Sequence, residues 1–211
     1  MTKHVQVKQV EILSDDWYVL KKTTYNYRRR DGSWQELSRE TYDRGNGATL
    51  LLYNTVSRCV VLTRQFRYPT YVNGNSEGWL IETAAGLLDS KTPAARIRQE
   101  VEEETGYKIR EVTPVFEAFM SPGSVTERLF FFIAEYEERD RQSDGGGNVA
   151  EGEDIEVLEI PFDSAIAMIS SGEICDGKTI MLLQHVALNI FNGPQVKMEI
   201  SGDHQDLNTK N

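Results

Sequence analysis

The feature that most constrains this chain is a short stretch, residues 84–107, in which a glycine-containing loop leads into an acid-rich segment. Thr92 is a favourable N-cap, Pro93 suits the first helical position, and Gly106 supplies a left-handed stop. These local signals predict a helix that begins and ends within this stretch with little help from tertiary structure.

One face of the predicted helix is apolar and the adjacent face is acidic. Ala94, Ile97 and Val101 recur at helical spacing and are expected to face a core. At about 100° per residue, three acids fall in one arc beside this stripe, whereas Glu102 points elsewhere. The three acids are Glu100, Glu103 and Glu104.

These acids carry an electrostatic cost. Like charges repel, and the carboxyl end of a helix is the negative end of its macrodipole. A solvated charged face is the usual interpretation of a glutamate run, but it leaves this cost unexplained. A hard dication offsets it, because Mg²⁺ prefers carboxylate and carbonyl oxygens and often binds alongside phosphates. The pattern therefore predicts a catalytic metal site.

The same stretch resembles the Nudix box, G-x5-E-x7-R-E-U-x-E-E-x-G-U. The matching residues are Gly86, Glu100, Val101, Glu103, Glu104, Gly106 and Tyr107. Three departures accompany the match. The spacing from Gly86 to Glu100 is one residue short, Thr92 stands where the first glutamate belongs, and Gln99 replaces the arginine that normally orients the acids.

The resemblance extends over residues 14–179 and is strongest to bacterial GDP-mannose hydrolases of the Nudix superfamily, in which the box is also shortened and altered. It implies hydrolysis of GDP-mannose to GMP and mannose 1-phosphate. The alternative substrate is ADP-ribose or an ADP-sugar. The alternative of another class is a non-catalytic nucleotide-sugar sensor or binding protein.

The resemblance also implies roles for individual residues. The expected ligands of Mg²⁺, or of Mn²⁺ in its place, are the Ala85 carbonyl, Glu100, Glu104 and Glu153. The candidates for the base that activates water are Glu103, Glu127 and Glu151. The expected substrate-binding residues are Trp17, Arg39, Arg67, Glu127 and Lys178.

Several of these residues have plainer interpretations. Trp17 can be a core residue, Lys178 a solvated lysine beside a helix, and Arg64 either a phosphate-binding residue or a solvated strand end. Residues 140–153, DRQSDGGGNVAEGE, are expected to form a mobile loop that closes over substrate, or else a disordered acidic hairpin tip.

The residue pattern predicts an α+β protein. Residues 4–42 alternate apolar and polar positions, which indicates strands with a hairpin turn at Asp31 and Gly32. Apolar runs at 48–54, 59–67 and 78–86 indicate further strands, as do 155–161 and the segment 112–138, which is expected to form two strands split at SPG with 129–136 in the second. PFDSAIAMISSG and TIMLLQHVALNIF indicate helices. The resemblance implies the α/β/α Nudix fold, with a mixed sheet between helices.

A small N-terminal sheet is marginally stable alone and is expected to pack on its own domain or on a second subunit. The resemblance favours a homodimer formed through this sheet. The expected organisation is an N-terminal dimerisation sheet at 1–43, a catalytic domain at 44–195 and a polar tail at 196–211.

Composition limits the partners. The formal net charge is −10 and the pI is about 4.9, which argues against general binding to nucleic acid or anionic membranes. No segment reaches the roughly 18 apolar residues of a membrane span, and the first residues lack a signal-peptide core. A cytoplasmic location is expected, with Cys59 as a buried free thiol.

Overall fold

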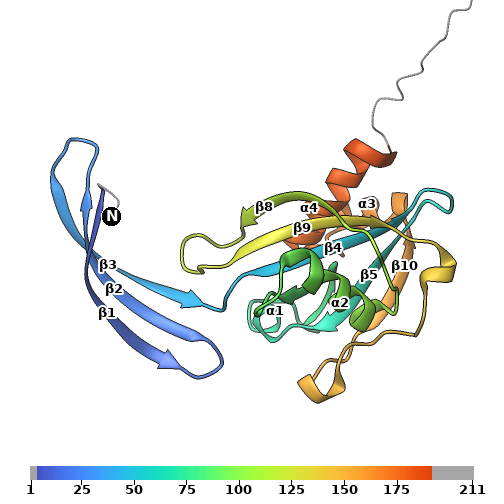
Figure 1. Ribbon diagram of the computed structural model, residues 1–211, viewed down its shortest axis with the longest axis horizontal. Helices are drawn as coiled ribbons and strands as arrows, with labels where there is room; N and C mark the ends of the chain where they lie inside the picture. Colours follow the sequence, from blue (N-terminus) through green and yellow to red (C-terminus); the bar gives the residue numbers. More distant parts are fainter. Residues whose placement is uncertain (1–3, 192–211) are drawn as a thin grey trace, which may run out of the picture.

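The computed structural model describes residues 4–191, apart from the side chain of Glu151, and it contains two sheets (Figure 1). The first is a three-stranded antiparallel sheet in the order β1-β2-β3. Its strands are β1 (Val5–Asp15), β2 (Val19–Arg28) and β3 (Trp34–Asp43). The predicted turn lies between β2 and β3, where Gly32 has φ of 86°.

The N-terminal sheet extends away from the rest of the molecule (Figure 1). The end of β3 joins it to the body, because the amide of Tyr42 donates to Ser124 O at 2.8 Å and Thr126 donates its amide to Tyr42 O at 3.1 Å. Asp43 adds a contact, accepting from Lys21 Nζ at 2.8 Å and from Thr126 Oγ1 at 3.1 Å. These bonds anchor one end of the sheet.

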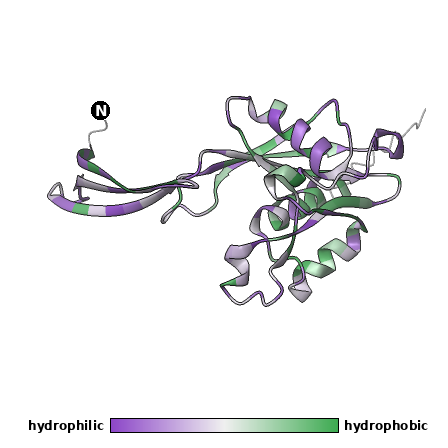
Figure 2. Cartoon of the chain, turned by 90° about the horizontal axis from the view of Figure 1, so that it is seen from below, coloured by the Kyte–Doolittle hydropathy of each residue, from purple (hydrophilic) through white to green (hydrophobic). Residues whose placement is uncertain are grey.

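Most of the N-terminal sheet is exposed. All residues of β1 are exposed, including the apolar side chains of Val5, Val7, Val10 and Ile12. Figure 2 shows hydrophobic residues along this sheet although it stands apart from the body. The apolar side chains of β1 are therefore not buried against the rest of the described chain.

The second sheet is mixed and forms the centre of the body. Its order is β10-β5-β4-β9-β8, with β6 paired to β5 and β7 paired to β4. The β4–β9 pair is parallel, and the other pairs are antiparallel. The strands are β4 (Gly47–Asn54), β5 (Cys59–Phe66), β6 (Trp79–Glu82), β7 (Ala84–Leu87), β8 (Thr113–Phe119), β9 (Arg128–Glu135) and β10 (Glu156–Pro161).

Helices cover both faces of this sheet. They are α1 (Tyr68–Tyr71), α2 (Pro93–Thr105), α3 (Phe162–Ser171) and α4 (Gly177–Val186). Ile97 and Val101 of α2 are fully buried in one core, whereas α3 and α4 supply Phe162, Leu182 and Leu183 to a second core. This arrangement confirms the predicted α/β/α fold with its mixed sheet. Short 3-10 turns occupy Glu138–Asp140 and Val149–Glu151.

Residues 78–86 form two strands instead of the single strand that the apolar run suggests. The break falls at Thr83, whose amide donates to the Thr179 hydroxyl at 2.7 Å and whose own hydroxyl lies 2.8 Å from that of Thr49. This buried hydroxyl cluster fixes the chain where it leaves β5 and pairs with β4. The break thereby delivers Ala85 to the neighbourhood of α2.

Two further details differ from expectation. Helix α4 begins two residues early, at Gly177, because the Asp176 carboxylate caps it by accepting from the Thr179 amide at 3.0 Å. Its predicted last turns are a separate π-helical turn, Ala187–Phe191.

Cys59 is half-buried, Cys175 is exposed, and both are free thiols. Within residues 4–191, no helix is long and apolar enough to cross a membrane.

Candidate active site

Helix α2 has the boundaries that its caps predict. The Thr92 hydroxyl accepts from the Ala95 amide at 3.4 Å, and Gly106 ends the helix with φ of 80° while its amide donates to Glu102 O. The three acids on its face separate into two environments. Glu100 and Glu104 are buried, whereas Glu103 is exposed.

Glu104 is the most unusual carboxylate in the part of the chain that the structure describes. It is 2% exposed, and no hydrogen-bond partner among the described residues reaches its Oε2. Burial raises the pKa of Glu104 well above its ordinary value, and the charges of Glu100 and Glu153 raise it further. A buried acceptor without a donor is costly, so this carboxylate fits a site completed by a cation.

Glu100 lies directly against the backbone of β7. A Cβ added at Gly86 would come within 2.1 Å of Glu100 Oε1, so only glycine allows this approach. Ala85 precedes Gly86 in the same strand, and Arg96 forms an ion pair with Glu100. The glycine of the sequence motif thus makes room for an acid of the same motif.

The triple-glycine loop brings Glu153 to the carboxyl end of α2. The amides of Gly146 and Gly147 donate to Glu104 O at 2.9 Å and Glu103 O at 3.1 Å. Glu153 Oε2 accepts from the Asn148 amide at 2.7 Å, and a Cβ at Gly147 would lie 2.5 Å from that oxygen. The loop is therefore docked on the helix, where its amides satisfy carbonyls of the last turn.

The acids do not by themselves form a side-chain cage. Among the described residues, no three His, Cys, Asp or Glu side chains converge closely enough to hold a metal ion. Glu100 is instead paired with Arg96 and Glu153 with a backbone amide. The predicted ligand set combines carboxylates with a backbone carbonyl, and these oxygen donors match a hard dication.

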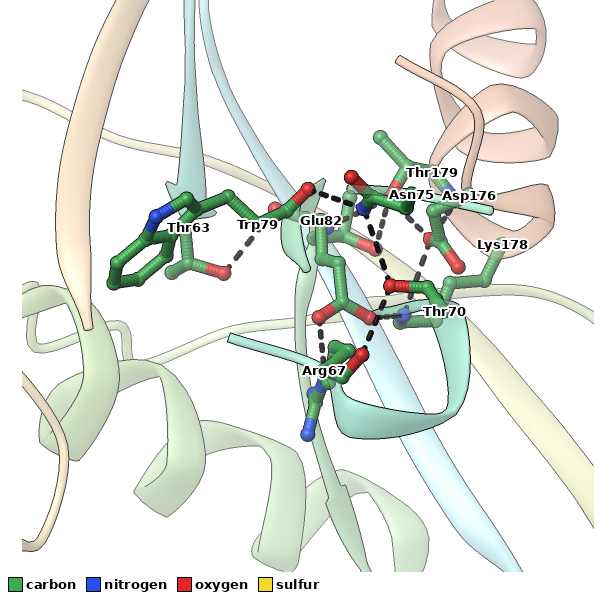
Figure 3. A network of polar contacts seen from close by, with 10 residues as sticks. Thr63, Arg67, Thr70, Asn75, Trp79, Glu82, Asp176, Lys178 and Thr179 are labelled. Atoms are coloured by element: carbon green, nitrogen blue, oxygen red, sulfur yellow. Dashed lines mark hydrogen bonds and ion pairs between the residues drawn. The ribbon is translucent and has the colours of Figure 1, made fainter. Parts of the chain in front are cut away.

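Figure 3 shows a second charged cluster, centred on Glu82 at the end of β6. Arg67 Nε donates to Glu82 Oε2 at 2.6 Å, and Lys178 Nζ forms an ion pair with Glu82 Oε1. Lys178 also lies 3.1 Å from Asp176 Oδ2. One carboxylate thus joins the two cations that the sequence predicts for substrate binding.

The charge states in this cluster support one another. The Glu82 side chain is 5% exposed, and its burial alone would raise its pKa, but Lys178 and Arg67 outweigh this effect and lower the pKa. Burial likewise disfavours the charged form of Lys178, yet Glu82 and Asp176 raise the pKa of Lys178 overall. These pKa shifts favour the charged forms of Glu82 and Lys178. The Lys178 side chain is only 13% exposed, so its solvated interpretation is wrong.

The sequence does not single out Glu82, although its carboxylate contacts both predicted substrate-binding cations. Its only signal is a carboxylate within the apolar run WLIE, which a surface strand position explains equally well. Arg64 is exposed; it forms an ion pair with Glu156 across β5 and β10, and its guanidinium lies over the Trp79 ring.

Three more of the predicted site residues are Glu127, just before β9, and Trp17 and Arg39 of the N-terminal sheet. Glu127 is 3.5 Å from Arg44 Nε, and the Arg44 guanidinium lies 5.4 Å from the centre of the Tyr18 ring. Trp17 is 80% exposed and touches the edge of Tyr18, so its core interpretation is wrong. Arg39 is exposed, and its Nη1 donates to the Ser38 carbonyl at 2.8 Å.

Trp17 and Arg39 have no contact with the buried acids within the described part of one chain. Glu103 Oε1 accepts from Gln99 Nε2 at 2.8 Å on the exposed side of α2. The side chain of Glu151 lies outside the described part of the structure. One chain therefore brings the two buried acids and Glu153 close to the Glu82 cluster. Trp17 and Arg39, on the N-terminal sheet, lie apart from this group.

Comparison with known proteins places the chain in a family. A model described as the NUDIX domain matches residues 43–183, more than half of the sequence. The chain belongs to the Nudix family. A model described as the GDP-mannose pyrophosphatase NudK N-terminal domain matches residues 4–42 of this Nudix protein.

Similar proteins cover nearly the whole Nudix chain. A GDP-mannose pyrophosphatase of Pectobacterium atrosepticum is 54% identical over 89% of this chain and 96% of its own length. One of Salmonella arizonae is 52% identical over 92% of this chain and 100% of its own length. A crystal structure of an ADP compounds hydrolase, 14% identical, superposes with a TM-score of 0.65 over 89% of this chain and 96% of its own, which confirms the fold alone.

Proposed function

We propose that this Nudix protein hydrolyses the diphosphate bridge of GDP-mannose and releases GMP and mannose 1-phosphate. The observation that carries the proposal is the buried Glu104 carboxylate. Its Oε2 has no hydrogen-bond partner among the described residues, and burial followed by the charges of Glu100 and Glu153 raises its pKa. The names of the similar bacterial proteins support the choice of substrate within this class.

Mg²⁺ is the proposed cofactor, with Mn²⁺ as a substitute. Its ligands would be the Ala85 carbonyl, Glu100, Glu104 and Glu153. When bound, a divalent ion neutralises charge that develops on phosphorus and lowers the pKa of a water molecule. The raised pKa of Glu104 supports this role, because a cation that replaces the proton relieves the same repulsion.

Arg67 and Lys178 would bind the diphosphate. Glu82 holds their charged groups from two different elements, the end of β5 and the start of α4, so both are positioned before substrate arrives. Such pre-positioned cations stabilise negative charge without reorganising during the reaction. Arg67, with several donors in one plane, suits two phosphate oxygens at once.

A carboxylate of the chain would take the proton from the attacking water, whose oxygen bonds to one phosphorus while the bridging P–O bond to that phosphorus breaks and the leaving phosphate departs with its electron pair. The candidates are Glu103, Glu127 and Glu151. Loss of the base lowers kcat while metal binding persists, whereas loss of a ligand weakens metal binding as well. Metal titrations of the three glutamine variants therefore separate these roles.

The N-terminal sheet supports a homodimer as the working unit. Its exposed Val7, Val10 and Ile12 need a covering surface that the described part of one chain does not supply. Trp17 and Arg39 lie apart from the buried acids of their own chain. In the partner's site, Trp17 would stack on the nucleobase and Arg39 would donate hydrogen bonds to it. We propose residues 1–43 as the dimerisation unit, residues 44–195 as the catalytic domain, and the cytoplasm as the location. Residues 196–211, the proposed tail, lie outside the described residues.

A panel of nucleotide sugars with Mg²⁺ and product identification tests this function. We expect GDP-mannose to yield GMP and mannose 1-phosphate, and Glu104→Gln to abolish turnover. Rapid cleavage of ADP-ribose with neglect of GDP-mannose would replace the substrate assignment. Ligand binding without turnover, unaffected by Mg²⁺ or by Glu100→Gln, would establish a sensor.

A further inference from the structure

The arginine expected immediately before Glu100 is absent, and its replacement does not take over the same contact. The side chain of Gln99 donates to Glu103 Oε1 at 2.8 Å and accepts from Lys91 Nζ. Both contacts lie on the exposed side of α2. A different group must orient the buried Glu100 carboxylate.

Arg96 provides that contact from one helical turn earlier. Its Nη2 forms an ion pair with Glu100 Oε1, which is the pairing expected between residues four apart on a helix. Its Nε donates to the Leu87 carbonyl at 3.0 Å. The Arg96 side chain is 17% exposed, so solvent screens these contacts less than it would screen a surface ion pair.

The second contact links the helix to β7. Leu87 is the last residue of that strand, and the carbonyl predicted to bind metal belongs to Ala85 in the same strand. Gly86, between them, is the residue against which the Glu100 carboxylate packs. One guanidinium therefore fixes both the rotamer of Glu100 and the distance between α2 and β7.

We propose that Arg96 is a positioning residue of the metal site and replaces the arginine missing from position 99. This inference rests on the proposed metal role of Glu100. Arg96 does not touch the substrate. It holds two oxygen ligands from separate elements in one arrangement, a role in which partners of metal ligands typically contribute about 10–100-fold to metal affinity.

A Coulomb argument makes the test sharp. Removing a positive charge beside an acidic site favours cation binding on electrostatic grounds alone, whereas removing a positioning residue weakens it. Arg96→Ala therefore has opposite expected effects under the two explanations. Arg98→Ala is the matched control, because Arg98 lies exposed on the same helix and donates to the Arg110 carbonyl instead of to an acid.

The measurement is Mn²⁺ binding to the full chain without substrate, with the concentration of free Mn²⁺ read from its electron paramagnetic resonance signal. We expect Arg96→Ala to weaken Mn²⁺ binding by about tenfold or more and Arg98→Ala to change it by less than about twofold. Wild-type or tighter Mn²⁺ affinity in folded Arg96→Ala would overturn the inference.

Arg96→Lys keeps the charge but loses the two-armed geometry, and it decides the matter if the alanine variant does not fold. Weaker Mn²⁺ binding by Arg96→Lys supports positioning, and unchanged binding refutes it. Failure of the proposed function looks different, because the wild-type protein would then bind no Mn²⁺. If the wild-type protein binds Mn²⁺ and Glu100→Gln loses it while Arg96→Ala keeps it, the Arg96 inference alone is wrong.

Discussion

The catalytic body and the N-terminal sheet treat their functional side chains in opposite ways. The body buries its acids and holds Arg67, Lys178 and Glu82 in one charged cluster. The sheet leaves Trp17 and Arg39 exposed, together with a row of apolar side chains on β1. We propose from this difference that one chain supplies the phosphate- and metal-binding residues, whereas the surface that recognises the rest of the substrate is completed by a second chain.

The largest expected effect falls on the body. Glu104→Gln removes a proposed metal ligand and should lower kcat/KM for GDP-mannose by more than about 100-fold, since partners of ligands alone contribute 10–100-fold. Steady-state kinetics at several Mg²⁺ concentrations measures the loss. Full activity of this variant at limiting Mg²⁺ would show that α2 is not the metal site.

Glu82→Gln tests whether the body positions its cations before substrate binds. Loss of the shared carboxylate leaves Arg67 without its ion-pair partner and Lys178 with Asp176 as its remaining partner. Removing one partner of a fully buried pair typically costs about 3–5 kcal/mol of stability, and the Asp176 contact and the 39% exposure of Arg67 reduce that cost here. We expect a lower free energy of unfolding in urea and a higher KM for GDP-mannose.

A double-mutant cycle of Glu82→Gln with Lys178→Ala sharpens this test. The two changes should be non-additive, because the second removes a charge that the first has already separated from Glu82, its main partner. Additive losses in stability and KM would contradict the idea that Glu82 makes one unit of the two cations.

A charge on β1 should break the assembly while leaving the body folded. Val10→Lys places a cation among the exposed apolar residues, and we expect light scattering to report a monomer in place of a dimer. Gln9→Lys is the matched control on the same strand and should stay dimeric. A dimer that persists in Val10→Lys would move the interface away from β1.

A smaller effect concerns pH. Because burial and neighbouring acids raise the pKa of Glu104, the folded protein keeps a proton that the unfolded chain releases near the ordinary pKa of 4.5. Metal-free protein should therefore lose stability as pH rises from 4.5 through the raised pKa, and this part of the loss should vanish in Glu104→Gln. Thermal melts of both proteins with and without Mg²⁺ measure it, and identical pH profiles would contradict the assigned burial.

The features that the sequence predicts are those whose signals lie within a few residues of each other. Thr92, Pro93 and Gly106 act within a few bonds of the helix that they bound, so α2 was predicted with its ends. The alternating pattern of residues 4–42 fixed three strands in the same way. Such features depend on neighbouring residues in the chain.

The contacts that the sequence did not predict join distant segments. Glu82 contacts Arg67, which follows β5, and Lys178 of α4. At Thr83, whose amide donates to a hydroxyl on α4, the chain stops pairing with β5 and begins to pair with β4. Periodicity carries no information about such pairs. The sequence also does not predict the proposed role of Arg96, which stands in for the arginine missing at position 99. Although both positions are on one helix, that role depends on the Leu87 carbonyl of β7.

Subunit complementation tests most directly whether the site is divided between chains. Two variants that we expect to be inactive alone, Glu104→Gln and the double variant Trp17→Ala/Arg39→Ala, are mixed and allowed to exchange subunits. If the sheet serves the partner's body, mixed dimers contain one intact site, and GDP-mannose hydrolysis should recover to about a quarter of wild type in a random mixture of a two-fold dimer. Mixed dimers that form and stay as inactive as either variant alone would contradict the account.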